Sequence, residues 1–150
     1  MNTSQYISRL NTLYKTGAAT EHSYRGDLQQ LLMDLLPEIL VTNEPSRVSC
    51  GAPDYVLTRR EVPVGYIEAK DVGVNLHSLQ LKEQFDRYKA GLSNLIITDY
   101  LHFQFFREGE FITEVRIAEL TGGEIRPLEA SFSEFEHLIK DFVQVVSQSN

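Results

Sequence analysis

Hydrophobic and polar positions follow two different periods along this chain, and each period predicts a different kind of element. Apolar residues recur every three or four positions, as in amphipathic helices, in residues 4–15, 21–36, 76–90 and 133–146. Alternation with period two, or a short apolar run, predicts strands in residues 39–43, 55–58, 63–70, 94–98, 102–107 and 111–117. The polar residues Arg59, Arg60 and Glu61 separate the second and third strands, which therefore predict a hairpin.

The order of these elements predicts an α/β fold. Two helices precede three strands, a helix, three more strands and a final helix. Helices would then cover both faces of one mixed sheet, which is an α/β sandwich. The length of 150 residues suits one domain, so we expect residues 1–150 to form a single unit. No apolar run approaches the roughly 20 residues of a membrane-spanning helix, and no signal peptide is evident, so we expect a cytoplasmic protein with no membrane partner.

Composition and missing motifs narrow the possible functions. Lys plus Arg is 14 and Asp plus Glu is 21, a net charge of −7, which argues against tight and autonomous binding of nucleic acid. Nucleotide-binding motifs of the GxxxxGK[ST] and GxGxxG types are absent, as are HExxH and GxSxG. The single cysteine, Cys50, excludes a multi-cysteine zinc site.

Candidate chemistry lies on the predicted hairpin. Residues 51–54 (GAPD) precede its first strand, and residues 67–70 (IEAK) end its second strand. Side chains two apart on a strand share a face, so Glu68 and Lys70 point the same way, and pairing across the hairpin can bring Asp54 near Glu68. Two carboxylates beside an ammonium suit Mg²⁺, which takes oxygen ligands together with water and phosphate. The pattern predicts metal-assisted hydrolysis of a phosphodiester.

A simpler interpretation of these residues also exists. An Asp at a strand start is a common turn residue, and a Glu and a Lys two apart can form a solvated strand face. Short patterns also arise by chance. Tyr66 and Val64 are expected to share the face of Glu68, which would make that face half-buried, and charged groups in such places usually have a partner or a task.

Gln84 and Tyr88 are one helical turn apart, on one side of the helix predicted after the hairpin. An amide and a phenol hydroxyl there could contact a phosphate or position Lys70. Alternatively, Tyr88 is a core residue and Gln84 a surface residue.

Together these residues resemble the PD-(D/E)XK nuclease superfamily. Pro53 and Asp54 match its first metal-binding acid, residues 68–70 match its E-x-K, and residues 84–88 look like the QxxxY element of its RecB-type branch. A wider likeness joins the chain to the N-terminal nuclease domain of single-chain type ISP and type IIG restriction-modification enzymes. That likeness rests on residues 20–25 (TEHSYR), 43–45 (NEP), 51–54 (GAPD), 65–70 (GYIEAK) and 95–100 (LIITDY).

The resemblance implies a fold and a site. The fold would be a restriction-endonuclease-like α/β/α sandwich with a central mixed sheet flanked by helices. Asp54, Glu68 and the backbone carbonyl of Ala69 would ligate Mg²⁺, with Mn²⁺ as a substitute. Lys70 would position the attacking water and stabilise the developing charge.

The resemblance also implies supporting residues. Gln84 and Tyr88 would support the site or touch the DNA backbone. Glu21 matches an acid brought to the site from a helix, where it would hold a second metal ion or a water, or else it is only a favourable charge at a helix N-terminus. Tyr24 and Arg25 are weaker candidates, because Tyr24 fits the apolar helix face and Arg25 could pair with Glu21 or reach a phosphate.

For partners, the resemblance implies double-stranded DNA delivered by helicase, methyltransferase and target-recognition domains, and a transient dimer for double-strand cleavage. Methyltransferase and helicase motifs are absent from the 150 residues, so the chain would be part of a larger restriction-modification protein or a free-standing homologue. The alternatives are a catalytically inactive module of this fold that contacts DNA or protein, a repair or RNA nuclease using the same site, and an acidic structural domain with a chance motif.

Overall fold

The computed structural model of the chain describes residues 1–19, 21–43 and 51–146, except for the side chains of residues 21, 22, 80, 145 and 146. Its helices are α1 (Thr3–Tyr14), α2 (Glu21–Leu35), α3 (Leu79–Gly91) and α4 (Phe132–Val146), with a 3-10 turn at Glu129–Ser131. Its strands are β1 (Leu40–Asn43), β2 (Tyr55–Arg59), β3 (Val62–Ala69), β4 (Asn94–Thr98), β5 (His102–Arg107), β6 (Glu110–Arg116), β7 (Ala118–Thr121) and β8 (Glu124–Pro127).

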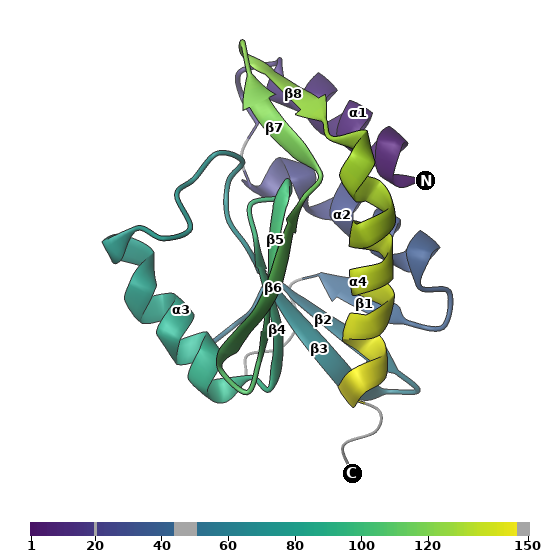
Figure 1. Cartoon of the computed structure of the whole chain (residues 1–150), viewed down its shortest axis with the longest axis vertical. Coiled ribbons are helices and arrows are strands. Elements are labelled where there is room, and N and C mark those ends of the chain that lie inside the picture. Colours follow the sequence, from purple (N-terminus) through teal and green to yellow (C-terminus); the bar gives the residue numbers. More distant parts are fainter. Residues whose placement is uncertain (20, 44–50, 147–150) are drawn as a thin grey trace.

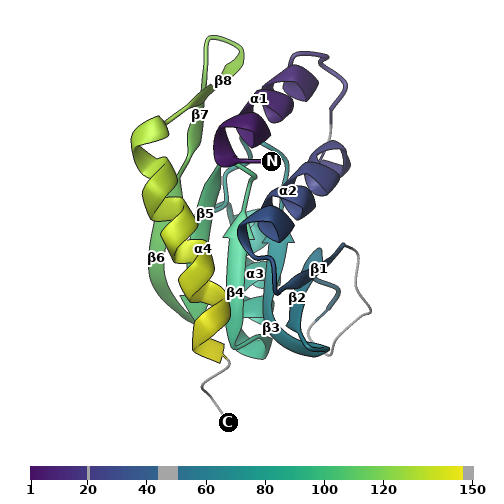
Figure 2. The same ribbon diagram turned by 90° about the vertical axis from the view of Figure 1, so that its right-hand side faces the viewer.

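The centre of the fold is a six-stranded sheet with the order β1-β2-β3-β4-β5-β6. Strands β3 and β4 are parallel and are connected through α3, whereas the other neighbouring strands are antiparallel. Helix α3 covers one face of this sheet, and α1, α2 and α4 lie on the other side (Figures 1 and 2). The expected α/β/α sandwich with a central mixed sheet is therefore confirmed.

The hairpin of β2 and β3 determines where the candidate residues lie. Arg60 and Glu61 make its turn with φ angles of 51° and 68°, the left-handed pair that matches the twist of a tight hairpin. Tyr55 is opposite Ile67 in the ladder, which places the start of β2 beside the end of β3. A register shift near Leu57 makes Val64 an extra residue of β3, and Val64 packs into the large core. The expectation that Val64 shares the face of Glu68 was therefore wrong, because the bulge interrupts the alternation.

The large core fills the space between the sheet and the helices α1, α2 and α4. Its fully buried members include Leu28 and Leu31 from α2, Ile67 from β3 and Phe135 from α4. Gly65 allows α4 to approach the sheet, since a Cβ atom there would lie 2.4 Å from the ring of Phe142.

A second, two-stranded sheet of β7 and β8 was not predicted. Its turn is Gly122-Gly123, with φ angles of 60° and 77°, and this glycine pair was the available sequence signal. The hairpin packs against α1, where the backbone N–H of Ile125 donates to Asn11 Oδ1 at 2.9 Å.

In the described ranges, no helix has the length and apolar character needed to cross a bilayer.

Candidate active site

Five side chains predicted from the sequence converge at the carboxyl end of β3. Asp54 immediately precedes β2, Glu68 lies near the end of β3, and Lys70 directly follows that strand. Gln84 and Tyr88 reach the same place from α3, which covers this face of the sheet. The antiparallel hairpin joins Asp54 to Glu68, and the crossover between β3 and β4 adds the α3 residues.

Glu68 is the most deeply buried charged group of this cluster, with 3% of its surface exposed. Its Oε2 atom accepts a hydrogen bond from Gln84 Nε2 at 3.0 Å and lies 3.2 Å from Lys70 Nζ. Its Oε1 atom is buried and receives no hydrogen bond from the described residues. Burial, together with the charge of Asp54, raises the pKa of Glu68 to about 8 even though Lys70 opposes the shift.

Asp54 is held by two donors. Its Oδ2 atom accepts the backbone N–H of Ala69 at 2.8 Å, and its Oδ1 atom accepts from Arg25 Nη2 at 2.5 Å. Both side chains of this ion pair are mostly buried, with 11% of Arg25 and 13% of Asp54 exposed. The hydroxyl of Tyr55 donates to the backbone carbonyl of Arg25 at 3.0 Å, so α2 and β2 are tied together directly beside the pair.

Lys70 follows the last residue of β3, where the chain begins to leave the sheet. Its backbone N–H still donates to the carbonyl of Thr98 at 2.9 Å, which continues the ladder with β4 and fixes the direction of its side chain. The Lys70 side chain is 19% exposed, whereas that of Glu68 is 4% exposed. The ammonium therefore lies on the solvent side of the buried carboxylate.

Tyr88 is a core residue, one of the two alternatives that the sequence left open, and it lies beside the site. It is 3% exposed and packs with Phe85 and Leu95 in the smaller cluster under α3. Its pKa is raised by burial and by Glu68, and hydrogen bonds from Gln84 and the Ala52 backbone oppose the shift.

Gly51 is the close neighbour of Tyr88 across the site. Its φ angle is 138°, and a Cβ atom there would lie 3.0 Å from the Tyr88 hydroxyl oxygen. Glycine is needed at this position on both counts, because L residues rarely adopt such a φ angle and the ring leaves little room. The GAPD segment thus serves the packing of the site as well as supplying Asp54.

The other candidates lie on α2. The Glu21 side chain is outside the described residues, so its role stays a prediction. Tyr24 is a core residue, 2% exposed, with its ring 5.3 Å from that of Tyr100. Arg25 was expected to pair with Glu21 or with phosphate. It pairs with Asp54, 29 residues away, and a helical pattern contains no signal for such a distant contact. A pairing with Glu21 lies outside the described side chains.

The cluster suits a hard divalent cation. Asp54 and Glu68 are carboxylates of the kind Mg²⁺ prefers, and the buried Oε1 atom of Glu68 offers an acceptor without a donor among the described residues. A cation would also offset the burial and repulsion that raise the pKa of Glu68. The described ranges contain no group of three or more His, Cys, Asp or Glu side chains able to hold a metal ion. The carboxylate pair would thus need oxygen ligands from the backbone, water or substrate.

Comparison with known proteins supports the fold. No protein-family model and no curated protein sequence matches the chain. Among solved structures, the chain is similar to one in the cryo-EM structure of a DrdV–DNA complex, with a TM-score of 0.71 and 21% sequence identity. The match covers 95% of this chain but only 13% of that one, so this chain spans about an eighth of its neighbour's length. The likeness confirms the restriction-endonuclease-like sandwich, and at this identity it shows the fold alone.

Proposed function

We propose that this chain is a Mg²⁺-dependent DNA endonuclease domain of the PD-(D/E)XK superfamily, serving as the nuclease module of a type ISP or type IIG restriction-modification enzyme. The observation that carries the proposal is the buried Glu68 carboxylate, which has one oxygen without a donor among the described residues and lies beside Asp54 and Lys70. The fold likeness to a chain in a DNA complex supports the choice of DNA as substrate.

Each residue then has a role. Asp54, Glu68 and the Ala69 carbonyl would hold Mg²⁺, which when bound supplies a positive charge for the phosphate and lowers the pKa of bound water. Gln84 keeps Glu68 oriented through its 3.0 Å hydrogen bond, and Tyr88 supports Gln84 from the core side.

Lys70 acts on the reacting groups. Its ammonium can orient the attacking water and stabilise the extra negative charge on the phosphate as the bond from water oxygen to phosphorus forms. The bond from phosphorus to the leaving oxygen breaks in the same reaction, and the leaving oxygen takes up a proton. The Lys70 ammonium lies 3.2 Å from Glu68 Oε2, at the edge of the pair formed by Asp54 and Glu68.

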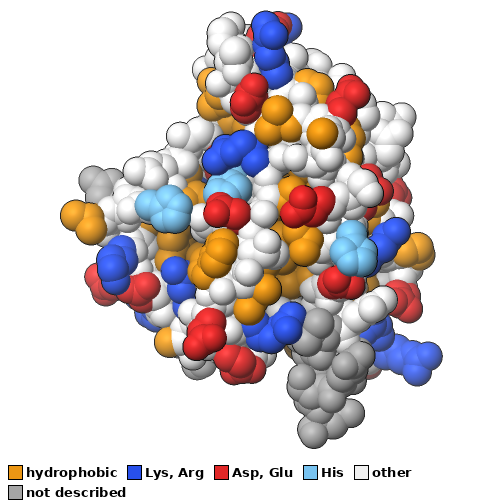
Figure 3. Space-filling view, viewed as in Figure 1, with side chains coloured by type: hydrophobic (Ala, Val, Ile, Leu, Met, Phe, Trp, Pro, Cys, Tyr) orange, Lys and Arg blue, Asp and Glu red, His pale blue; other side chains and the backbone are white. Residues whose placement is uncertain are grey.

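The acidity of the chain bears on how DNA would arrive. A net charge of −7 gives weak attraction for phosphates. Figure 3 shows acidic and basic side chains interspersed on one face, with no continuous basic field among its described residues. Double-stranded DNA would therefore be delivered by other domains, such as helicase, methyltransferase and target-recognition domains. Cleavage of both strands would need two copies or two encounters.

One observation favours a second candidate function. Arg25 already occupies Oδ1 of Asp54 at 2.5 Å, as would be expected if the fold were kept for DNA or protein contact without cleavage. A carboxylate has about four acceptor positions, however, so this ion pair and a metal ion are compatible.

Cleavage of supercoiled plasmid in Mg²⁺ or Mn²⁺ separates the two functions. We expect the chain, at high concentration and low salt, to nick the plasmid only when a divalent cation is present. Lys70→Ala should lower the rate by roughly 100-fold or more, because it removes charge stabilisation in the transition state. Lys82→Ala is the matched control, since Lys82 is an exposed lysine that pairs with Asp86 on α3.

Metal-dependent nicking that is equal in the Lys70→Ala variant and the wild type would contradict the proposed site. Absence of nicking in the wild type under all these conditions would favour the inactive module.

A further inference from the structure

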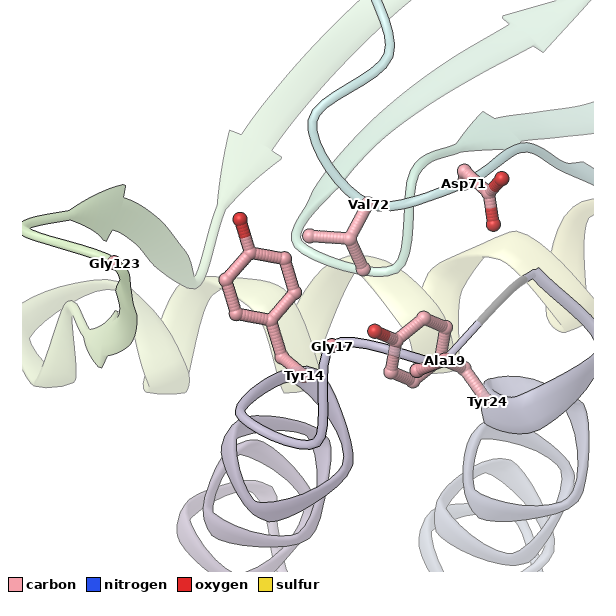
Figure 4. A pocket seen from close by; sticks show the side chains of 7 residues that line it. All are labelled: Tyr14, Gly17, Ala19, Tyr24, Asp71, Val72 and Gly123. Atoms are coloured by element: carbon pink, nitrogen blue, oxygen red, sulfur yellow. The ribbon is translucent and has the colours of Figure 1, made fainter.

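A cavity of about 460 Å³ opens beside the candidate active site but is not lined by its residues. Its walls come from the end of α1, the connection to α2, the start of α2, the connection after β3 and the β7–β8 turn. Figure 4 shows the side chains that matter most, which are Tyr14, Tyr24, Asp71 and Val72. This volume lies within the usual range for small-molecule sites.

Two polar groups of this cavity have no hydrogen-bond partner among the described residues and are open to the cavity. Tyr24 is 2% exposed and its ring packs on Tyr100, yet its hydroxyl makes no hydrogen bond with the described residues, and it faces the cavity (Figure 4). The Asp71 carboxylate is exposed at the rim of the cavity and forms neither an ion pair nor a hydrogen bond within the described ranges. The Tyr24 side chain is almost fully buried, and its hydroxyl faces the cavity without a partner in the described part of the chain, so a ligand in the cavity can bind it by a hydrogen bond.

The remaining walls suit a flat, apolar group. The half-buried ring of Tyr14 lies across the opening from Val72, and the Tyr24 hydroxyl is directed toward the space near them (Figure 4). Gly17, Ala19 and Gly123 complete the lining with little or no side chain. A planar ring placed against Tyr14 would present its edge to the hydroxyl of Tyr24 and the carboxylate of Asp71.

The cavity is adjacent in the chain to the candidate catalytic residues. Asp71 directly follows Lys70, and Tyr24 directly precedes Arg25, the partner of Asp54. Neighbouring Cα atoms are 3.8 Å apart, so a nucleotide whose phosphate lies at Lys70 has its base within reach of this opening.

We propose that this cavity binds a single unpaired nucleobase next to the phosphate that is cut. The inference rests on the proposed nuclease function and extends it to the substrate. Aromatic side chains stack on unpaired bases, and a base in duplex DNA must leave the helix to enter such a site. Asp71 accepts hydrogen bonds, and an exocyclic amine offers two donor hydrogens where an unpaired thymine offers only its N3–H, so we expect bases with an exocyclic amine to be preferred.

The test measures binding without cleavage. One duplex carries a single unpaired 2-aminopurine, the matched duplex carries the same base paired with thymine, and a third carries an unpaired thymine. Each is titrated with the 150-residue chain in EDTA, with fluorescence and anisotropy as readouts. We expect the unpaired 2-aminopurine duplex to bind about 10-fold more tightly than the paired duplex, with its emission quenched by stacking.

Variants assign this preference to the cavity. Tyr14→Ala should abolish the quenching and most of the 10-fold preference, whereas Tyr14→Phe should retain both, because it keeps the ring. Asp71→Ala should remove the discrimination between 2-aminopurine and thymine. Asp86→Ala is its control, since Asp86 is an exposed carboxylate on α3 that pairs with Lys82. Tyr24→Phe should weaken binding without loss of fold.

Equal affinity for unpaired and paired duplexes overturns the inference, and so does a preference that survives Tyr14→Ala and Asp71→Ala. Because no divalent cation is present, this result is independent of cleavage. Lys70-dependent nicking without a preference for the unpaired base would leave the nuclease proposal standing and remove only the base site. Displacement of 2-aminopurine by millimolar arginine amide but not by deoxyguanosine monophosphate would also overturn it, and would indicate a basic peptide as ligand.

Discussion

The two faces of β3 have opposite characters. Toward α4, Gly65, Ile67 and Ala69 pack into the large core with almost no exposed surface. Toward α3, Tyr66 packs against the smaller apolar cluster, and the buried Glu68 carboxylate accepts a hydrogen bond from Gln84. One strand thus contributes stability on one face and chemistry on the other, since successive side chains alternate.

The face toward α3 is less stabilising than the face toward α4. A buried carboxylate with one unsatisfied oxygen lowers the stability of the folded state. Burial raises the pKa of Glu68, and the charge of Lys70 offsets only part of this shift. A face selected only for stability would hold an apolar residue at position 68. The difference between the faces therefore predicts that substitutions have separable effects.

The largest expected effect on stability is on the core face. Ile67 is fully buried, and Ile67→Ala should lower the free energy of unfolding by about 2–5 kcal/mol, because it removes packed methyl groups and leaves a cavity. Urea denaturation followed by circular dichroism measures this. Tyr66→Ala is the comparison on the opposite face, where the side chain is only partly buried, and it should cost less. Equal decreases in the free energy of unfolding for the two variants would contradict the difference between the two faces.

The next effect concerns pH. The pKa of Glu68 is raised from its ordinary value of 4.5 to about 8, so between these values the folded state binds more protons than the unfolded state. In metal-free protein the Glu68 contribution to stability is therefore complete below pH 4.5 and is lost as the pH rises through 8. Glu68→Gln should remove this loss and stabilise the protein at pH 9 by about 1–3 kcal/mol. Denaturation in EDTA at pH 5 and pH 9 tests this, and an equal difference between the proteins at both values would refute it.

A smaller effect concerns Arg25. Its guanidinium neutralises Asp54 at 2.5 Å, so Arg25→Ala should make the site more negative and tighten Mn²⁺ binding by about 3- to 10-fold. Arg9→Ala is the control, because Arg9 pairs with Asp27, a different carboxylate. Calorimetry measures both variants. Weaker Mn²⁺ binding after Arg25→Ala would show that Arg25 positions Asp54 for the ion instead of competing with it.

Much of this arrangement followed from local sequence pattern. The polar turn at residues 59–61 and the alternation around it placed Asp54 beside Glu68, and the structure has them at adjacent positions of that hairpin. The apolar run of residues 94–98 is strand β4, fully buried at the centre of the sheet as predicted. Such features can be predicted from sequence because each depends on residues close in the chain.

Features that depend on contacts between residues distant in sequence could not be predicted. The pairing of Arg25 with Asp54 arises from the docking of α2 on β2, and the position of Val64 arises from a bulge in the ladder. The hairpin of β7 and β8 had a local signal in Gly122-Gly123, but its strands have only four residues each, too short for a clear alternation. Tertiary contacts, more than local preferences, set these details.

Calorimetric titration with Mn²⁺ tests the central claim most directly. The wild-type chain should bind the ion at a site that the double variant Asp54→Ala/Glu68→Ala loses, and Lys70→Ala should keep the site. Circular dichroism confirms that the variants are folded. Binding that is unchanged in the double variant would contradict the assignment of these two carboxylates to the metal.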